Sequence, residues 1–330
     1  MSTDPSPSLW RRIQKQNFTK WKALADYLEL NPEQRKTLLP NSKFPLNLPL
    51  RLAAKIVKGT LDDPLLRQFV PTQSETTPTK GFIADPVGDA PSRRSPKLLH
   101  KYNRRALLVC TSACVMNCRF CFRQNFDYAD GDKSFREELA ILAADPSIKE
   151  VILSGGDPLS LSDAVLGELL GKLTEISHIK RIRFHTRFPI GIPERIDDSF
   201  INLLAQQKKQ IWFVVHSNHP LELDADVLAA LKRVQKLGIP VLAQTVLLKG
   251  VNDDTNTLQL LSETLVNAGV IPYYLHQLDR VAGAAHFEVH PNEGLRLVEE
   301  IAKYLPGYAV PKYVEEIPGK PYKTRVLPKS

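Results

Sequence analysis

The sequence predicts an α/β fold built on a parallel sheet, with a helical region in front of it. From Arg105 onward, short runs of β-forming residues recur, and each is followed by a helical pattern. Successive strand–helix units imply parallel strands joined by right-handed crossovers. The 330 residues are enough to bury a sizeable core. Two architectures fit these observations: a doubly wound sheet and a full or partial β/α barrel.

The individual elements follow from periodicity and from helix-stop residues. Strands are predicted at Ala106–Cys110, Glu150–Leu153, Arg181–His185, Ile211–His216, Val241–Leu248 and Val270–Gln277. Helices are predicted at Phe135–Ala144, Asp163–Ile176, Ser199–Gln207, Ala225–Leu237, Thr255–Ala268 and Asn292–Tyr304. Asp145-Pro146 and Gly238 lie where helices are expected to end.

Three regions are expected along the chain. Residues 1–75 form an N-terminal helical region, in which Lys20–Leu30 and Leu48–Lys58 carry apolar residues at helical spacing. Residues 76–104 form a loop or linker rich in Pro, Thr, Ser, Asp and Gly. Residues 105–330 form the α/β core and end in a segment with several lysines.

Composition narrows the class of protein. The net charge of +8 suits an acidic partner, and the simpler alternative is a solvated basic surface. Nucleic-acid binding is not expected, because the sequence has no dense basic block interleaved with aromatic residues. The N-terminus lacks the apolar stretch of a signal peptide, and no run approaches the length of a membrane span, so we expect a cytoplasmic protein without membrane contact. All four cysteines lie between Cys110 and Cys121, a density that indicates metal binding rather than disulfides.

The cysteines Cys114, Cys118 and Cys121 have the spacing C-x3-C-x2-C directly after a predicted strand. Thiolates are soft ligands suited to iron–sulfur clusters, and three of them leave one iron of a cubane open to a substrate. The alternatives are buried structural cysteines and a zinc site, although zinc usually requires a fourth ligand on a second motif. Cys110 could supply a fourth thiolate and make a closed electron-transfer cluster, but its place within the strand favours a core residue.

This cysteine loop resembles the cluster motif of the radical S-adenosylmethionine superfamily, in which an aromatic residue such as Phe120 precedes the last cysteine. The resemblance implies a [4Fe-4S] cluster whose open iron binds S-adenosylmethionine. It also implies a partial (β/α)6-type barrel, which decides between the two architectures. Gly155, Gly156 and Asp157 follow the second predicted strand and match the superfamily's glycine-rich segment, which contacts the methionine amino group.

A closer resemblance, from about residue 100 to 325, is to the lysine 2,3-aminomutases. The matching segments are His100–Arg105, Cys121–Arg123, His216–Pro220, Gln244–Asp253 and Tyr274–Asp279. These enzymes rearrange lysine with pyridoxal 5′-phosphate (PLP) as a further cofactor, bound by a lysine near the chain end. Alignment on the Lys-Thr pair selects Lys323 for this role, with Lys320 as the competitor and a solvated lysine as the alternative to both. The family's glycine-rich run before Lys-Thr is reduced here to Gly319.

The resemblance also implies roles for other residues. Arg123 matches the arginine that binds the substrate carboxylate, a task suited to a guanidinium. Asp279 matches an aspartate that holds the distal ammonium of lysine, and Glu316 stands where the family has a second aspartate. Two further pairs match residues around the cofactors. Tyr102 and Arg105 match residues that pack on PLP or hold its phosphate, and His216 and Gln244 match residues near the adenosyl group or PLP. The alternatives are a surface or cluster-tuning arginine for Arg123, an exposed charge for Glu316, and ordinary packing for the residues of the two pairs.

The chain stops soon after Lys323, and in this respect it resembles the short bacterial mutases that make (R)-β-lysine for modification of elongation factor P. The expected partners are therefore L-lysine, a reduced flavodoxin or ferredoxin-type electron donor, and, through its product, elongation factor P with its lysyl-transferring ligase. A homo-oligomer is left open. The alternative functions are a radical aminomutase for another amino acid and a non-enzymatic iron–sulfur electron carrier.

Overall fold

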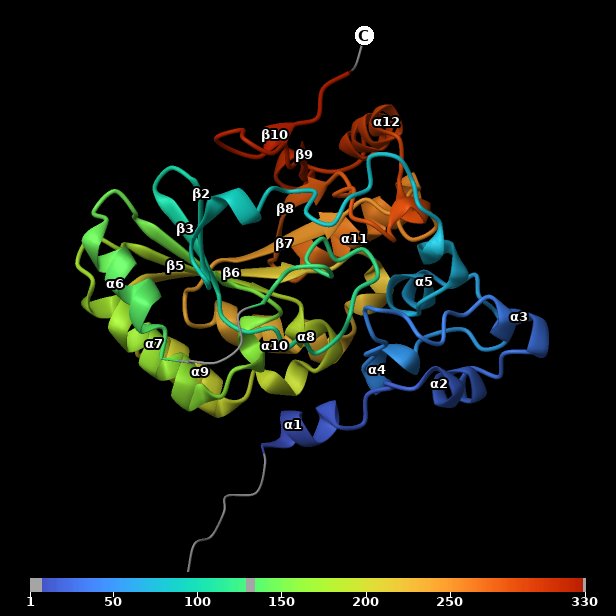
Figure 1. The fold of residues 1–330 in the computed structure, drawn as a ribbon, viewed down its shortest axis with the longest axis horizontal. Helices are drawn as coiled ribbons and strands as arrows, with labels where there is room; N and C mark the ends of the chain where they lie inside the picture. Colours follow the sequence, from blue (N-terminus) through green and yellow to red (C-terminus); the bar gives the residue numbers. More distant parts are fainter. Residues whose placement is uncertain (1–7, 129–133, 329–330) are drawn as a thin grey trace, which may run out of the picture.

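The computed structural model describes residues 8–128 and 134–328. In this part of the chain, ten strands form one curved sheet in the order β1 to β10 (Figure 1). The strands are β1 (Arg93–Ser95), β2 (Leu98–Tyr102), β3 (Arg105–Val109), β4 (Glu150–Ser154), β5 (Arg181–Thr186), β6 (Gln210–His216), β7 (Val241–Val246), β8 (Ile271–His276), β9 (Lys312–Glu315) and β10 (Thr324–Arg325). Strands β3 to β9 are parallel, whereas β1, β2 and β10 pair antiparallel at the two edges. Because β1 and β10 are edges of the sheet, the barrel is partial, as predicted.

The predicted strands correspond to β3–β8, and the structure adds elements on both sides. Strand β9 extends the parallel sheet beyond β8. Strands β1 and β2 lie within the stretch 76–104, for which the sequence predicts a linker. They were missed because Ser95-Pro96 interrupts two short runs, and only tertiary pairing with β3 makes them strands.

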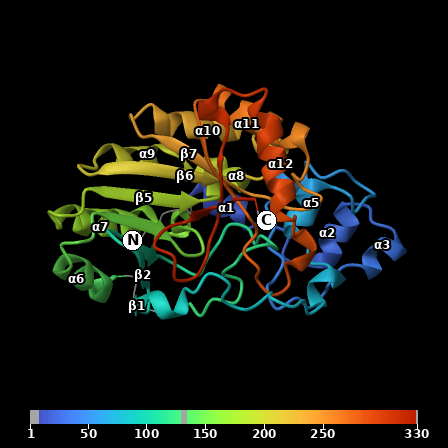
Figure 2. The ribbon, with the colours of Figure 1, turned by 90° about the horizontal axis from the view of Figure 1, so that it is seen from above.

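Helices cover the outer side of the sheet (Figure 2). They are α6 (Arg136–Ala144), α7 (Asp163–Glu175), α8 (Phe188–Gly191), α9 (Asp198–Ala205), α10 (Ala225–Gln235), α11 (Thr255–Asn267) and α12 (Pro291–Ala302). Five of them begin at a side chain that accepts a hydrogen bond from a backbone N–H of the first turn: Ser162, Asp197, Asp224, Asp254 and His290. Each buries an apolar stripe against the strands; in α7 it consists of Leu166, Leu169, Leu170 and Leu173.

The N-terminal region consists of short helices beside the barrel, shown in blue in Figure 1. They are α1 (Leu9–Gln14), α2 (Trp21–Tyr27), α3 (Pro32–Lys36), α4 (Leu50–Ala53) and α5 (Pro64–Phe69). Helix α2 is shorter than the predicted Lys20–Leu30, because Glu29 adopts a left-handed conformation with φ of 56°. Helix α4 occupies only the start of the predicted Leu48–Lys58. Side chains of this region, including Trp10 and Phe69, share one hydrophobic core with the barrel strands.

No helix among the described residues combines the length and the apolar character that a membrane span requires.

Candidate active site

The cluster cysteines Cys114, Cys118 and Cys121 lie on the loop that follows β3. Side chains of the N-terminal region hold this loop from outside. The Nδ2 atom of Asn17 donates to the Val115 carbonyl at 2.8 Å, and that of Asn47 donates to the Cys114 carbonyl at 3.1 Å. The backbone that presents the first cysteine is therefore positioned by contacts that span 98 and 67 positions of the sequence.

Arg119 anchors the second half of the same loop. Its side chain is 1% exposed and forms an ion pair with Glu75 in the 3-10 helix Gln73–Thr76. It also donates to the Phe44 carbonyl at 2.7 Å and to the Ser42 hydroxyl at 2.9 Å. These bonds satisfy a buried guanidinium and tie the loop between Cys118 and Cys121 to the N-terminal region.

The environment of the thiols fits a metal cluster. Burial raises the pKa of the Cys121 thiol to about 11 and also raises the pKa of Cys118, although the Arg187 guanidinium opposes the rise there. Metal binding offsets this cost because it stabilises the thiolates directly. In the described residues, no group of three His, Cys, Asp or Glu side chains is arranged around a single ion. A cubane does not need such an arrangement, since each thiolate binds a different iron, so the three soft donors fit a [4Fe-4S] cluster.

Cys110 lies apart from the other three cysteines. Its side chain is part of the hydrophobic core, and its thiol lies 3.5 Å from the Leu108 carbonyl. It is not among the described residues that line the cavity beside the cluster loop. The prediction of a core residue is confirmed.

A cavity of about 420 Å³ lies at the carboxyl ends of the parallel strands and includes the cluster cysteines in its wall. Every residue predicted for the site lines it: Tyr102, Arg105, Cys114, Cys118, Cys121, Arg123, Gly155, Gly156, Asp157, His216, Gln244, Asp279, Glu316 and Lys323. Lys320, the competitor for PLP, is an exposed residue that is absent from the described cavity wall. The segments that were singled out separately in the sequence therefore converge on one space.

The glycine-rich segment after β4 packs tightly against the cluster loop. A Cβ atom on Gly156 would lie 2.3 Å from the Ala113 carbonyl oxygen, and one on Gly155 would lie 2.7 Å from that of Thr111. The amide of Gly156 donates to Thr111 O at 2.6 Å. The sequence suggested that these amides face a ligand, but this one is used inside the protein. The Gly155 carbonyl accepts from the Tyr128 hydroxyl at 3.3 Å, and a carbonyl oxygen has a second lone pair that suits the ammonium of a ligand.

Asp157 joins the end of β4 to the end of β5. Its carboxylate accepts hydrogen bonds from the Thr186 hydroxyl at 2.8 Å and from the amides of Leu159, Arg187 and Phe188 at 3.0, 2.8 and 3.0 Å. With these partners the carboxylate positions Arg187. Direct contact between Asp157 and a cofactor stays a prediction.

Glu316 is a buried acid with three partners rather than an exposed charge. Its Oε2 atom accepts from Lys323 Nζ at 2.9 Å and from the Tyr102 hydroxyl, and its Oε1 atom lies 3.3 Å from Lys101 Nζ. Burial alone would raise the pKa of Glu316, but Lys323 and the Tyr102 hydrogen bond outweigh burial and hold the pKa below its usual value. Glu316 therefore holds Lys323 inside the cavity as a charged pair.

Arg123 is held by a second acid, Asp89. The Nε atom of Arg123 lies 2.9 Å from Asp89 Oδ2, and Lys101 Nζ lies 3.1 Å from Asp89 Oδ1. Burial would raise the pKa of Asp89, but the two cations outweigh it and lower the pKa. One Nη atom of Arg123 contacts the Ser154 hydroxyl at 3.3 Å. Asp89 uses the Nε atom and Ser154 one Nη atom, and the other Nη atom is suited to a carboxylate in the cavity.

Asp279 differs from the other acids because no described side chain forms a hydrogen bond or ion pair with its carboxylate. The side chain of Asp279 keeps some solvent contact through the cavity. Burial nevertheless raises the pKa of its carboxyl group to about 6, although the charge of Lys323 opposes this rise. An unpaired carboxylate in such a place is suited to the ammonium group of a ligand.

Polar atoms without partners mark another part of the wall. The Nε2 atoms of His216, Gln244 and His276, at the ends of β6, β7 and β8, are buried and have no hydrogen-bond partner among the described residues. The same is true of His185, whose ring lies 5.6 Å from that of His216. Burial lowers the pKa of His216 to about 3, so its imidazole is neutral. Buried orphan donors and acceptors of this kind fit polar cofactors such as PLP and an adenosyl group.

Sequence reasoning assigned no role to Lys101, Asp89, His276 and Arg187. Lys101 and His276 lie inside segments that matched the family, so their position next to assigned residues was a usable signal. Asp89 lies in an irregular loop, and only the folded structure brings it to Arg123.

Comparisons with known proteins identify the family of this chain. The family model described as the radical SAM superfamily matches residues 108–261. L-lysine 2,3-aminomutase of Escherichia coli is 44% identical over 284 residues, which cover 85% of this chain and 83% of that protein. The Haemophilus influenzae protein of the same name is 39% identical over 319 residues, covering 96% and 94%. The chain belongs to the lysine 2,3-aminomutase family.

As a member of the lysine 2,3-aminomutase family, the protein is an isomerase, and its cofactors are a [4Fe-4S] cluster, S-adenosylmethionine and PLP. Membership therefore removes the non-enzymatic electron carrier from the alternatives. Among solved structures, a radical SAM methyltransferase from Sphaerobacter thermophilus matches with a TM-score of 0.49 and 19% identity, covering 66% of this chain and 68% of that one.

Proposed function

We propose that this aminomutase converts L-lysine into β-lysine by moving the amino group from C2 to C3. The observation that carries the proposal is the unpaired carboxylate of Asp279 in the same cavity as Arg123 and Lys323. A diamino acid needs a cation for its carboxylate and an anion for its distal ammonium. Arg123 provides the cation and Asp279 provides the anion.

Each end of the substrate has a partner in this arrangement. Arg123 binds the carboxylate through its Nη side, with Asp89 fixing the guanidinium. Asp279 binds the distal ammonium, and Glu316 keeps Lys323 and Tyr102 in position. Held at both ends, the substrate has a defined orientation, which brings C2 and C3 to a fixed place relative to the cluster loop.

The cofactors have matching groups around the cavity. Lys323 would hold PLP, with Tyr102 and Arg105 toward its phosphate, and His216 and Gln244 would contact the adenosyl group or PLP. When bound, the cluster and S-adenosylmethionine supply a radical and PLP supplies a π-system that stabilises the migrating group. The apolar wall residues Val246, Leu278 and Phe120 exclude water from this space.

The test is anaerobic incubation of cluster-loaded protein with L-lysine, PLP, S-adenosylmethionine and a strong reductant, followed by chiral mass spectrometry. We expect β-lysine together with 5′-deoxyadenosine. Formation of 5′-deoxyadenosine without β-lysine would reject lysine as the substrate. Formation of neither product by protein with full iron and sulfide content would reject the proposal.

The product is further proposed to be (R)-β-lysine, used to modify elongation factor P after transfer by its lysyl-transferring ligase. The net charge of +8 supports this, because it suits an acidic partner or a reduced flavodoxin or ferredoxin-type donor. The same chiral measurement tests the handedness. A mass increase on elongation factor P, in a mixture with the ligase, tests the use of the product. The (S) enantiomer, or no mass increase, would count against this assignment.

A mutase for another amino acid is the second candidate. Glu316, which stands where the family has a second aspartate, favours this candidate. Its carboxylate already contacts Lys101, Lys323 and Tyr102, so it is not free to bind the distal ammonium of lysine. Competition between lysine and glutamate distinguishes the two candidates, because Asp279 should attract a distal ammonium and repel a distal carboxylate. Stronger inhibition by glutamate than by lysine analogues would favour the second candidate.

A further inference from the structure

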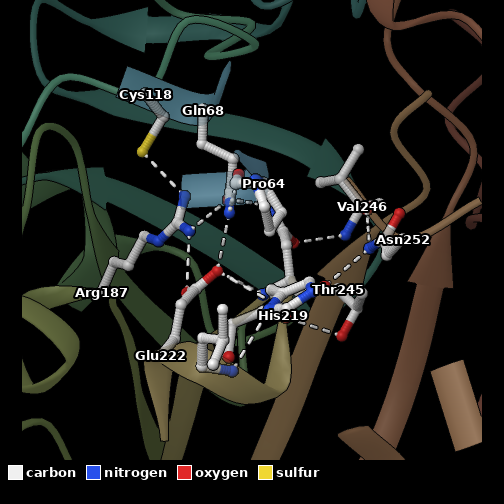
Figure 3. Close-up of polar contacts among 12 residues, drawn as sticks. Pro64, Gln68, Cys118, Arg187, His219, Glu222, Thr245, Val246 and Asn252 are labelled. Carbon is white, nitrogen blue, oxygen red and sulfur yellow. Dashed lines mark hydrogen bonds and ion pairs between the residues drawn. The ribbon is translucent and has the colours of Figure 1, made fainter. Parts of the chain in front are cut away.

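Arg187 follows β5 and points its guanidinium at the cluster loop (Figure 3). One Nη atom lies 3.0 Å from the sulfur of Cys118, within the range of a hydrogen bond to sulfur. The rings of Phe69 and Phe120 flank the guanidinium at 5.0 and 5.3 Å. Arg187 is 7% exposed, so its charge acts on Cys118 with little screening by water.

Two further side chains hold this guanidinium from the other side. The second Nη atom donates to Gln68 Oε1 at 2.7 Å and to Glu222 Oε2 at 2.9 Å. Gln68 lies in helix α5 of the N-terminal region, and its Nε2 atom donates to Glu222 Oε1 at 3.0 Å. Glu222 is completely buried. Arg187, Gln68 and Glu222 therefore each bond to the other two, and the remaining Nη atom of Arg187 is directed at the sulfur of Cys118.

Backbone and amide groups fix the triangle in turn. Glu222 Oε1 accepts from the amides of Asn218 and His219 at 3.2 and 3.1 Å. The Asn218 side chain donates to Gln68 Oε1 at 3.0 Å and accepts from the Val246 amide at 2.9 Å. These bonds, which are drawn in Figure 3, leave the guanidinium little freedom to turn away from Cys118.

We propose that Arg187 is a positioning residue that raises the reduction potential of the cluster, and that Glu222 and Gln68 hold it against Cys118. An added electron makes the cluster more negative, so a cation at its sulfur stabilises the reduced state more than the oxidised state. Glu222 opposes this effect, but it lies behind the guanidinium, and the nearer charge dominates. The inference needs the cluster and is independent of which amino acid is rearranged.

The wall of the cavity offers a matched control. Arg183 also lies on β5 and lines the cavity, and its Nε atom donates to the buried Glu150 at 2.6 Å. Among the described residues, it contacts no cysteine. The pair joins β5 to β4, and replacing it removes one positive and one negative charge without touching a cluster sulfur.

The experiment is a potentiometric titration followed by electron paramagnetic resonance, on anaerobically reconstituted full-length protein without S-adenosylmethionine or lysine. The variants are Arg187→Gln, the double variant Arg187→Gln/Glu222→Gln, and the control Arg183→Gln/Glu150→Gln, each checked for iron and sulfide content. We expect both Arg187 variants to shift the midpoint to a more negative potential and the control to leave it unchanged. In the double variant both members of the buried Arg187–Glu222 pair are neutral, so no unpaired charge stays buried. If the single variant does not fold, the double variant is used for the measurement.

Two outcomes would overturn the proposal. One is an unchanged midpoint in a cluster-loaded Arg187 variant. The other is an equal negative shift in the Arg183 control, which would assign the effect to charge in the cavity wall generally. Because lysine is absent from the titration, a failure of the proposed lysine reaction leaves the result readable.

Discussion

The amino group of Lys323 lies 2.9 Å from Glu316 Oε2, and this pair sits in the wall of the cavity that also contains the cluster cysteines. The contact favours Lys323 over Lys320 as the lysine that binds PLP, because Lys320 is exposed and outside the described wall. A lysine held by a buried acid is fixed in place before PLP arrives. We predict that binding of PLP to Lys323 would change this contact with Glu316.

Replacement of Lys323 by Ala should abolish covalent binding of PLP, whereas Lys320→Ala should retain it. The expected measurement is the visible absorbance of the bound cofactor and borohydride fixation followed by peptide mapping. Label on Lys320 in the parent protein, or full labelling of Lys323→Ala, would contradict the assignment. Circular dichroism of both variants controls for loss of the fold.

Replacement of Asp279 by Asn should weaken lysine binding and leave the cluster loaded. A charge-assisted hydrogen bond contributes about 1.5–3 kcal/mol, so KM should rise about 10- to 100-fold. Turnover at saturating lysine and iron content separate this effect from unfolding. An unchanged KM would place the distal ammonium elsewhere.

The same residue predicts a pH dependence. Burial raises the pKa of Asp279 to about 6, so its carboxylate is charged above that pH and becomes neutral as the pH falls through it. The KM for lysine should therefore be lowest above pH 6 and rise as the pH falls below 6. Asp279→Asn should remove this limb of the profile. A profile that keeps the limb in the variant would assign the titration to another group.

The sequence predicted the parallel strands and the cluster motif well because both depend on local patterns. The strands β3–β8 show β-rich runs, and the cysteine spacing is set within one loop. Strands β1 and β2 and the pairing of Arg123 with Asp89 depend on contacts between distant segments, which periodicity does not report. The need for Gly155 and Gly156 was visible in the sequence, and the structure adds a reason that the sequence did not show: the glycines allow close packing on Thr111 and Ala113. Their contact with a cofactor stays a prediction.

Cys110→Ala should keep the full iron and sulfide content, because this thiol lies in the core and not at the cluster. The loss of a buried sulfur should cost about 1 kcal/mol of stability, as for the removal of a small apolar group from a packed core. Cys114→Ala is the matched variant that should lose the cluster. Loss of iron in Cys110→Ala, with the fold retained, would make Cys110 a ligand.

Arg119→Met should destabilise the protein strongly, since it leaves the buried carboxylate of Glu75 without its partner. Removal of one member of a buried ion pair typically costs about 3–5 kcal/mol, whereas exposed pairs contribute about 0–1 kcal/mol. The exposed pair Lys36–Glu33 therefore provides the control, Lys36→Met. Urea denaturation of the cluster-loaded variants under anaerobic conditions measures the free energy of unfolding of both.

In the double variant Arg119→Met/Glu75→Gln, most of the stability should return, because no unpaired charge remains buried. If the double variant were as unstable as Arg119→Met, the cause would be the lost bonds to Ser42 and Phe44, and the N-terminal region would hold the cluster loop through those bonds instead.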